Sequence, residues 1–173
     1  MKVIPARWVG EVDSREFAPA RLQLTADMLL VSRSGTHRWF IMRCPCGCNE
    51  EVPVNLDSRT GPAWRLHKPG PKATLYPSIW RDTGCRSHFI LHRGSVWLFT
   101  GPSDDWGVKS IDGSTLESVA GALTDHFQHF ATIAEFNSHD PWDVYLACEN
   151  LVEKGSAIRG SGRFRQHYRR VKP

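Results

Sequence analysis

The stretch RCPCGCNEE at residues 43–51 places three cysteines at alternate positions, separated only by Pro45 and Gly47. The whole chain of 173 residues contains five cysteines, so most of them lie in this short segment. Cysteines crowded in this way form a disulfide, a reactive thiol or a metal site. The rest of the sequence has to decide among these three chemistries.

The N-terminal sequence MKVIPARWVGEVDSREF contains no apolar run of signal-peptide length. No segment approaches the ~20 consecutive apolar residues of a membrane span. We therefore expect a cytoplasmic protein that does not bind a membrane. Thiols stay reduced in the cytoplasm, so a metal site or a catalytic site is favoured over a disulfide framework.

A second thiol motif supports the metal interpretation. The segment GCRSHF at 84–89 contains a Cys-x-x-His pair. Thiolates at a strand exit, combined with such a pair beside another β element, are typical of tetrahedral zinc sites. Redox thiols or merely buried cysteines remain the alternatives, and Cys148, alone on a predicted helix, is expected in the core. The candidate zinc ligands are Cys44, Cys46, Cys48, Cys85 and His88.

Five candidates for four positions leave two kinds of zinc site open. A structural site uses four protein ligands, whereas a catalytic site uses three and keeps one position for water. A catalytic site needs a general base, and Glu50 and Glu51 directly follow the cysteines, although both are also ordinary surface residues. Ser78 and Ser87 lie near the same elements and are either nucleophiles or hydroxyls that satisfy turns.

Short apolar runs broken by Gly, Pro, Asp and Ser predict that the first half of the chain is β-rich. Pro53 makes its strand an edge strand or a bulge. The last two predicted strands form a hairpin that turns at Arg93-Gly94. The expected strands lie at 37–43, 51–56, 73–80 and in the hairpin at 88–99.

The apolar spacing becomes helical after residue 113. Steps of three and four predict one helix from Ser114 to about Ala134, and Ser114 with Glu117 forms a capping box. A second helix is expected from Asp140-Pro141 to Gly155. The segment 156–171 then resembles a β-ribbon around Gly160-Ser161-Gly162, and helix, helix, ribbon is the ending of a winged-helix module.

The predicted fold class is α+β, with a β-rich domain followed by a helical module. The predicted β-rich zinc-binding domain covers 1–100 and the linker covers 101–113. The winged-helix-like module with a basic tail covers 114–173. The length of the chain is compatible with one domain or two small ones.

The net charge of +4 is distributed unevenly. No acidic residue follows Glu153, so the tail is strongly basic and the preceding part is slightly acidic. Such a tail indicates a polyanionic or acidic partner, unless it is a solvated, partly disordered end. The arginines of this predicted partner-binding segment are Arg159, Arg163, Arg165, Arg169 and Arg170.

Three motifs occur in a fixed order: CPCGC at 44–48, TLYPSI at 74–79 and GCRSHF at 84–89. In combination they resemble a small bacterial domain-of-unknown-function family. Its members are often encoded with ubiquitin-like proteins and with E1- and E2-like enzymes, and they are regarded as peptidases that trim or remove the modifier. The resemblance implies a zinc-dependent or zinc-supported peptidase. It carries over the five zinc-ligand candidates as metal residues, and Ser78 and Ser87 only as motif positions.

Three functions therefore remain open. The first is a zinc-containing peptidase that processes or deconjugates a ubiquitin-like protein. The second is a non-catalytic zinc-binding adaptor. The third is a nucleic-acid-binding protein built from a zinc ribbon and a winged helix, which the basic tail favours. The acidic residues Asp143, Glu149 and Glu153 of the second helix argue against a recognition helix in a DNA groove.

Overall fold

The computed structural model describes residues 1–101 and 111–171. The chain divides into two compact units, Met1–Asp105 and Trp106–Pro173. The described part is mixed and β-rich, with four α-helices. Most of the predicted linker lies outside the described residues.

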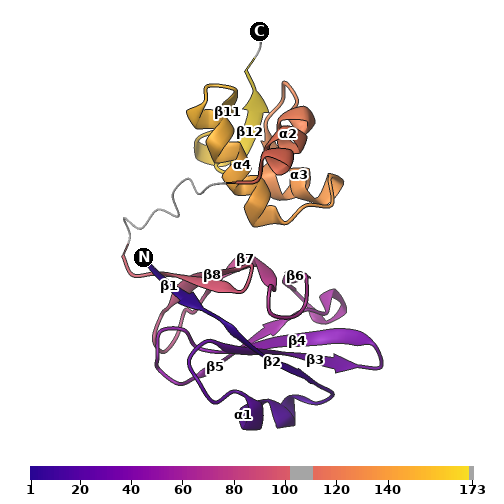
Figure 1. The fold of residues 1–173 in the computed structure, drawn as a ribbon, viewed down its shortest axis with the longest axis vertical. Helices are drawn as coiled ribbons and strands as arrows, with labels where there is room; N and C mark the ends of the chain where they lie inside the picture. The colour runs from indigo at the N-terminus through magenta and orange to yellow at the C-terminus, as the bar shows by residue number, and fades with distance from the viewer. Residues whose placement is uncertain (102–110, 172–173) are drawn as a thin grey trace. The chain divides into compact units, whose positions relative to one another are not determined.

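Two sheets build the first unit (Figure 1). The five-stranded sheet is antiparallel throughout, and the four-stranded sheet pairs its first two strands in parallel. In spatial order the five-stranded sheet contains β1 (Lys2–Pro5), β9 (Ser95–Phe99), β8 (His88–His92), β7 (Thr74–Trp80) and β6 (Arg65–His67). The four-stranded sheet contains β2 (Arg7–Val12), β3 (Asp27–Arg33), β4 (Thr36–Arg43) and β5 (Glu51–Asn55).

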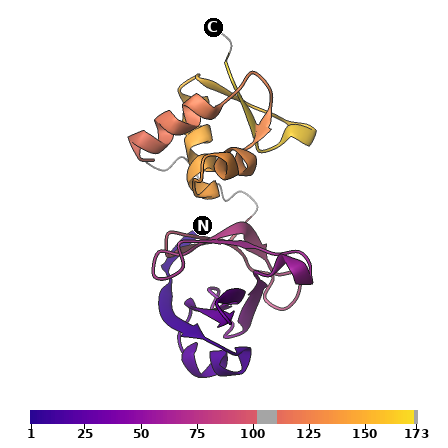
Figure 2. The same cartoon turned by 90° about the vertical axis from the view of Figure 1, so that its right-hand side faces the viewer.

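The two sheets face one another across the main core (Figure 2). Alternate residues of each strand point into it, as the pleat of a strand requires. The four-stranded sheet contributes Met28, Phe40, Met42, Val52 and Val54, and the five-stranded sheet contributes Leu75, Ile79, Phe89, Leu91, Val96 and Leu98.

A second, smaller core covers the outer face of the four-stranded sheet. There a 3-10 turn (Arg15–Phe17) and the short helix α1 (Ala18–Arg21) pack over the strands (Figure 1). Burial on both faces explains why β3 reads as a continuous apolar run, MLLV. A further 3-10 turn, Ser58–Thr60, leads toward β6.

The structure confirms the strands predicted from the sequence and adds others. The predicted segments appear as β4, β5, β7 and the β8–β9 hairpin, and Arg93 and Gly94 form its turn with positive φ. The position of Pro53 is also confirmed as an edge, because β5 is the last strand of its sheet. The prediction missed β1, β2, β3 and β6.

The second unit combines helices with a small three-stranded sheet in the order β10-β12-β11. The helix α4 packs against both α2 and α3. Its elements are α2 (Gly113–Ala122), β10 (Gln128–His129), α3 (Phe130–Phe136), α4 (Pro141–Glu153), β11 (Ala157–Arg159), a 3-10 turn (Gly162–Phe164) and β12 (His167–Arg170).

The prediction of one helix from 114 to 134 is wrong. The chain leaves the helical conformation at Leu123, and the Thr124 amide donates to Gln128 Oε1 at 3.0 Å. This turn brings β10 beside β12 before α3 begins. The predicted capping box is also wrong, because Asp112 caps α2 by accepting a hydrogen bond from the Thr115 amide.

The second predicted helix and the ribbon are confirmed. Asp140 caps α4 by accepting from the Trp142 amide at 2.9 Å, and Gly155 follows the helix with φ 72°. β11 and β12 pair antiparallel across the predicted turn. The winged-helix assignment itself stays a prediction.

Candidate functional site

Four of the five candidate ligands converge in the structure. Cys44, Cys46 and Cys48 lie in the loop between β4 and β5, and Cys85 lies in the loop between β7 and β8. Their sulfurs all lie within 4.8 Å of one another, with Cys44 Sγ 3.4 Å from Cys46 Sγ and 3.7 Å from Cys85 Sγ. All four are free thiols.

These sulfur separations fit a tetrahedral metal. Four sulfurs about 2.3 Å from a zinc ion form a tetrahedron with edges of about 3.8 Å. The observed separations are close to this value, whereas a disulfide needs sulfurs about 2.05 Å apart. The four cysteines can therefore hold a metal ion such as zinc.

Neighbouring polar groups favour ionisation of one thiol of the cluster, that of Cys85. Ser87 Oγ lies 3.4 Å from Cys44 Sγ and 3.4 Å from Cys85 Sγ, and Arg81 Nη1 lies 3.2 Å from Cys85 Sγ. Burial opposes ionisation of Cys85, but hydrogen bonds, first from the Ser87 side chain and amide, lower its pKa to about 6. Burial raises the pKa of Cys46 to about 12. Without a metal, then, the cluster favours a thiolate at Cys85 over one at Cys46.

Arg81 was not among the residues singled out from the sequence. It directly follows β7, and its guanidinium pairs with Glu50 at 2.6 Å while also donating to Cys48 Sγ at 3.6 Å. The arginine thus ties the loop of Cys85 to the loop of the other cysteines. Only the fold reveals this role, because Arg81 and Glu50 are distant in the sequence.

His88 does not lie among the thiols, contrary to the Cys-x-x-His prediction. Ser87 points toward the sulfurs, so its neighbour His88, the first residue of β8, points to the opposite side. There His88 Nε2 lies 3.1 Å from Ser78 Oγ. The structure therefore joins two residues that the sequence had assigned to different roles.

Aromatic rings hold His88 in place. The imidazole stacks on Trp80, with ring centroids 5.2 Å apart, and on Phe99 at 4.5 Å. Burial lowers the pKa of His88 below its ordinary value. A neutral imidazole next to a hydroxyl is the arrangement of a general base and a nucleophile.

The two candidate glutamates form ion pairs. Glu50 pairs with Arg81, as described above, and Glu51 Oε1 lies 3.8 Å from Arg43 Nη2. Only Glu50 approaches a thiol, with Oε2 3.7 Å from Cys48 Sγ. Neither carboxylate has a contact with Ser78 or His88 among the described residues.

Cys148 and the arginines of the tail belong to the second unit. Cys148 is buried in α4, as expected for a core residue. Arg159 pairs with Glu149 at 2.8 Å, and Arg170 donates to the Leu123 carbonyl at 3.0 Å. Arg163 and Arg169 lie over the rings of Phe164 and Phe127. These contacts, and the pairing of β11 with β12, overturn the alternative of a disordered tail up to residue 171.

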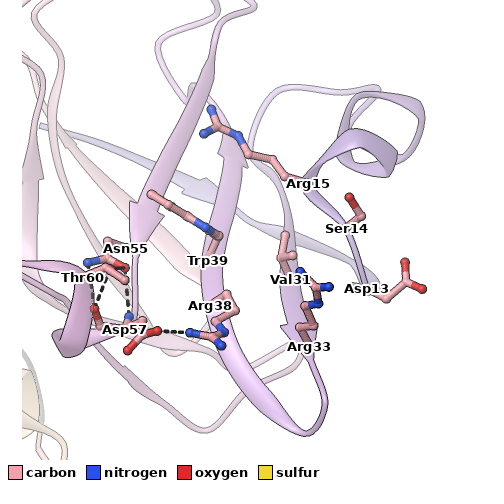
Figure 3. Close-up of a pocket in the computed structure, with 10 residues that line it drawn as sticks. All are labelled: Asp13, Ser14, Arg15, Val31, Arg33, Arg38, Trp39, Asn55, Asp57 and Thr60. Atoms are coloured by element: carbon pink, nitrogen blue, oxygen red, sulfur yellow. Dashed lines mark hydrogen bonds and ion pairs between the residues drawn. The ribbon is translucent and has the colours of Figure 1, made fainter.

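A pocket of about 330 Å³ lies on the four-stranded sheet, and its lining, drawn in Figure 3, includes none of the candidate zinc ligands, glutamates or serines. Arg15 lies over the ring of Trp39, and Arg38 and Arg59 both donate to Asp57. The pairing of Arg38 with Asp57 therefore compensates part of the charge that lines the pocket. Its chemistry is that of a structural ion-pair network, because Asp57 is buried and Arg59 and Arg38 hold its pKa well below the usual range.

A serine hydroxyl beside an imidazole is an arrangement that serine hydrolases use. The family comparison agrees: residues 14–99 match the family described as bacterial ubiquitination-like system serine protease (BubE). The matched segment, which includes β3 to β9, is similar to this family. No curated protein and no solved structure matches the chain.

Among the described residues, no helix combines the length and hydrophobicity that crossing a bilayer requires.

Proposed function

We propose that this protein is a serine peptidase that processes or deconjugates a ubiquitin-like protein, with Ser78 as nucleophile and His88 as general base. The observation that carries the proposal is the 3.1 Å separation of Ser78 Oγ and His88 Nε2. The description of the family as a serine protease of a ubiquitination-like system supports both the reaction class and the kind of substrate. In this proposal the nucleophile is the Ser78 hydroxyl, and not the zinc-bound water that the sequence suggested as an alternative.

In the proposed reaction, Ser78 Oγ attacks the carbonyl carbon of the scissile bond while its proton passes to His88 Nε2. The tetrahedral intermediate collapses when the bond to the leaving group breaks, and the imidazolium returns the proton to that group. A water molecule then attacks the acyl-enzyme with the same base and releases Ser78. The rings of Trp80 and Phe99 keep the imidazole oriented, a task that a carboxylate performs in a full triad.

In this proposal Cys44, Cys46, Cys48 and Cys85 hold zinc in a closed structural site. The ion, when bound, cross-links the β4–β5 loop to the β7–β8 loop. Ser87 and Arg81 support the thiolates from outside the ligand set. The arginines of the tail stay a predicted partner-binding surface, and no comparison supports nucleic acid as the partner.

Glutamate variants separate this mechanism from the metal-water alternative. Because Glu50 and Glu51 pair with arginines away from Ser78, we expect Glu50→Gln and Glu51→Gln to retain cleavage within about fivefold, the loss of a partly exposed ion pair. The measurement is kcat/KM on a C-terminally extended ubiquitin-like protein, with zinc content checked in each variant. A loss of ~10²–10⁴-fold in either variant would identify a glutamate base and contradict the serine mechanism.

The pH dependence of cleavage reports the protonation state of His88. Burial disfavours the imidazolium and lowers the pKa of His88, and only the neutral ring accepts the Ser78 proton. We therefore expect kcat/KM to fall as the pH decreases, with a midpoint below the ordinary histidine value of 6.5. Circular dichroism over the same pH range serves as the folding control. A midpoint above 6.5 would argue against His88 as the base.

A further inference from the structure

The three-stranded sheet of the second unit has an outer face that points away from α4. Tyr168 of β12 is fully buried and donates a hydrogen bond to Glu149 of α4 at 2.5 Å, so its side of the sheet faces that helix. Neighbouring residues of a strand point to opposite sides, which places His167 and Arg169 on the other face. The register puts His129 of β10 opposite His167, on the same outer face.

Two phenylalanine rings and two guanidiniums stack beside this face. Phe164, from the 3-10 turn before β12, stacks on Phe127 with ring centroids 5.2 Å apart. Arg163 Cζ lies 4.9 Å from the centroid of the Phe164 ring, and Arg169 Cζ lies 5.3 Å from that of Phe127. A guanidinium already oriented by a ring loses less conformational freedom when it binds an anion. We call these four residues the arginine–phenylalanine stack.

Gly160 makes room for the arginine–phenylalanine stack. A Cβ atom at this position would lie 2.7 Å from Phe164 Cβ and 3.3 Å from Phe127 Cε1. The Gly160 amide donates to the His167 carbonyl at 2.8 Å, which fixes the backbone at this place. A larger residue could therefore not be accommodated unless the rings moved. The stack is thus built into the connection between β11 and β12.

The arginines of the tail fall into two groups. Arg159 and Arg170 are engaged inside the unit, by a carboxylate and by a backbone carbonyl. Within the part of the chain that the structure describes, Arg163, Arg165 and Arg169 have no acidic partner. Arg169 makes one weak polar contact, 3.5 Å from its Nη1 to the carbonyl of the next residue. Three guanidiniums therefore retain donors for a ligand.

The arrangement favours the carboxylates of a protein over a nucleic acid. The planar fork of arginine fits a carboxylate and a phosphate equally well. Single-stranded nucleic acid, however, also stacks its bases on aromatic rings. Phe127 and Phe164 already stack on one another and under guanidiniums, so they do not offer free faces. Even counting Asp125, two residues before Phe127, the surface is positively charged and complementary to acidic side chains.

We propose that the arginine–phenylalanine stack, together with Arg165, is a docking surface for an acidic segment of a protein partner, whose Asp or Glu carboxylates are bound by Arg163 and Arg169. The inference goes beyond the proposed function, because no residue of this surface takes part in the reaction of Ser78. The surface also lies outside residues 14–99, which match the family, so it assigns the second unit a role of its own.

The test measures binding to the full chain by fluorescence anisotropy at about 0.1 M salt, where charges more than ~10 Å apart are screened. The probe is a labelled dodecapeptide of alternating Glu and Ser with blocked ends, and all proteins carry Ser78→Ala so that it stays intact. We expect Arg163→Gln/Arg169→Gln to raise Kd at least about tenfold, because charge-assisted hydrogen bonds are lost. Lys154→Gln/Arg159→Gln removes the same charge outside the stack and should change Kd by less than about twofold.

A substitution that keeps the charge separates a built site from general attraction. Phe164→Leu removes the ring under Arg163, and we expect Kd to rise about two- to fivefold, the contribution of an exposed cation–π contact. Phe136→Leu changes an 82% exposed ring outside the stack and should leave Kd unchanged. An unchanged Kd in Phe164→Leu would show that the stack does not orient the arginine, and circular dichroism checks that each variant is folded.

Three further results would overturn the proposal. The first is that the peptide binds no more tightly than the same peptide with Gln in place of Glu. The second is equal weakening in the two double variants, which would mean attraction by overall charge. The third is that a seven-nucleotide oligo-dT, with as many charges as the peptide, binds more tightly and depends on Arg163 and Arg169. None of these measurements involves cleavage, so their failure would leave the proposed function standing.

Discussion

Replacing Ser78 with alanine is expected to abolish cleavage while leaving the fold and the zinc content unchanged. The hydroxyl is half-buried on β7, and its one described side-chain contact is His88, so its removal leaves no buried partner that requires compensation. Loss of a serine nucleophile in a full triad costs on the order of 10⁶-fold in kcat, and without a third member we expect at least about 10³-fold here. Single-turnover cleavage of a C-terminally extended ubiquitin-like protein measures the effect.

Ser87→Ala is the matched control for this experiment. Ser87 lies 3.4 Å from two cluster sulfurs, so its loss should weaken metal binding by about 10–100-fold, as outer-shell changes do, yet leave cleavage intact when zinc is supplied. His88→Ala should lower cleavage by ~10²–10⁴-fold, the contribution of a general base. If Ser87→Ala is inactive with full zinc and Ser78→Ala is active, the two serines have been assigned the wrong way round.

The thiol cluster was largely predictable from the sequence. Three of its cysteines lie in one loop, so chain connectivity alone keeps them together, and Cys85 was recognised by its motif. What the spacing could not determine was the direction of each neighbouring side chain. Ser87 and His88 differ by one position, and the pleat sends them to opposite sides of β8.

The contact between Ser78 and His88 could not be predicted from the sequence either. Both residues were singled out, but one as a motif serine and the other as a metal ligand. Their contact depends on the register of β7 against β8, where Trp80 faces His88 and the pairing is irregular between Leu75 and Ile79. Register is a long-range property that no local pattern reports.

The predicted helix boundaries in the second unit were wrong for a comparable reason. The apolar spacing continues from Val119 to Ala134 because α2 and α3 both bury a face against α4. A periodicity count cannot distinguish two helices that share a packing partner from one longer helix. The break lies at Leu123 and Thr124, where the Thr124 amide donates to the Gln128 side chain instead of to a helical carbonyl.

Removing the metal is expected to destabilise the first unit strongly. The four ligands come from two loops whose cysteines are about forty residues apart, so a bound ion joins two loops that are otherwise linked through Arg81 and by packed thiols. Structural zinc supplies about 10–16 kcal/mol in small domains that are unfolded without it. The first unit also has a core between its two sheets, so we expect metal loss to cost less free energy of unfolding than in those domains. The expected fall in Tm is still more than about 10 °C, because 1 kcal/mol shifts Tm by about 4–8 °C in a domain of this size.

The matched control is a thiol outside the cluster. Protein purified without added metal should contain about one zinc per chain, Cys85→Ser should bind none, and Cys148→Ala should keep its zinc although it too loses a cysteine. Cys148 is buried in α4, so any instability of that variant arises in the second unit and should be indifferent to chelators. Elemental analysis and thermal melts with and without a chelator make the comparison. If the wild-type protein is folded, metal-free and unaffected by chelation, the four close sulfurs are only packed thiols and the zinc proposal is wrong. The proposed roles of Ser78 and His88 would not be affected by that result.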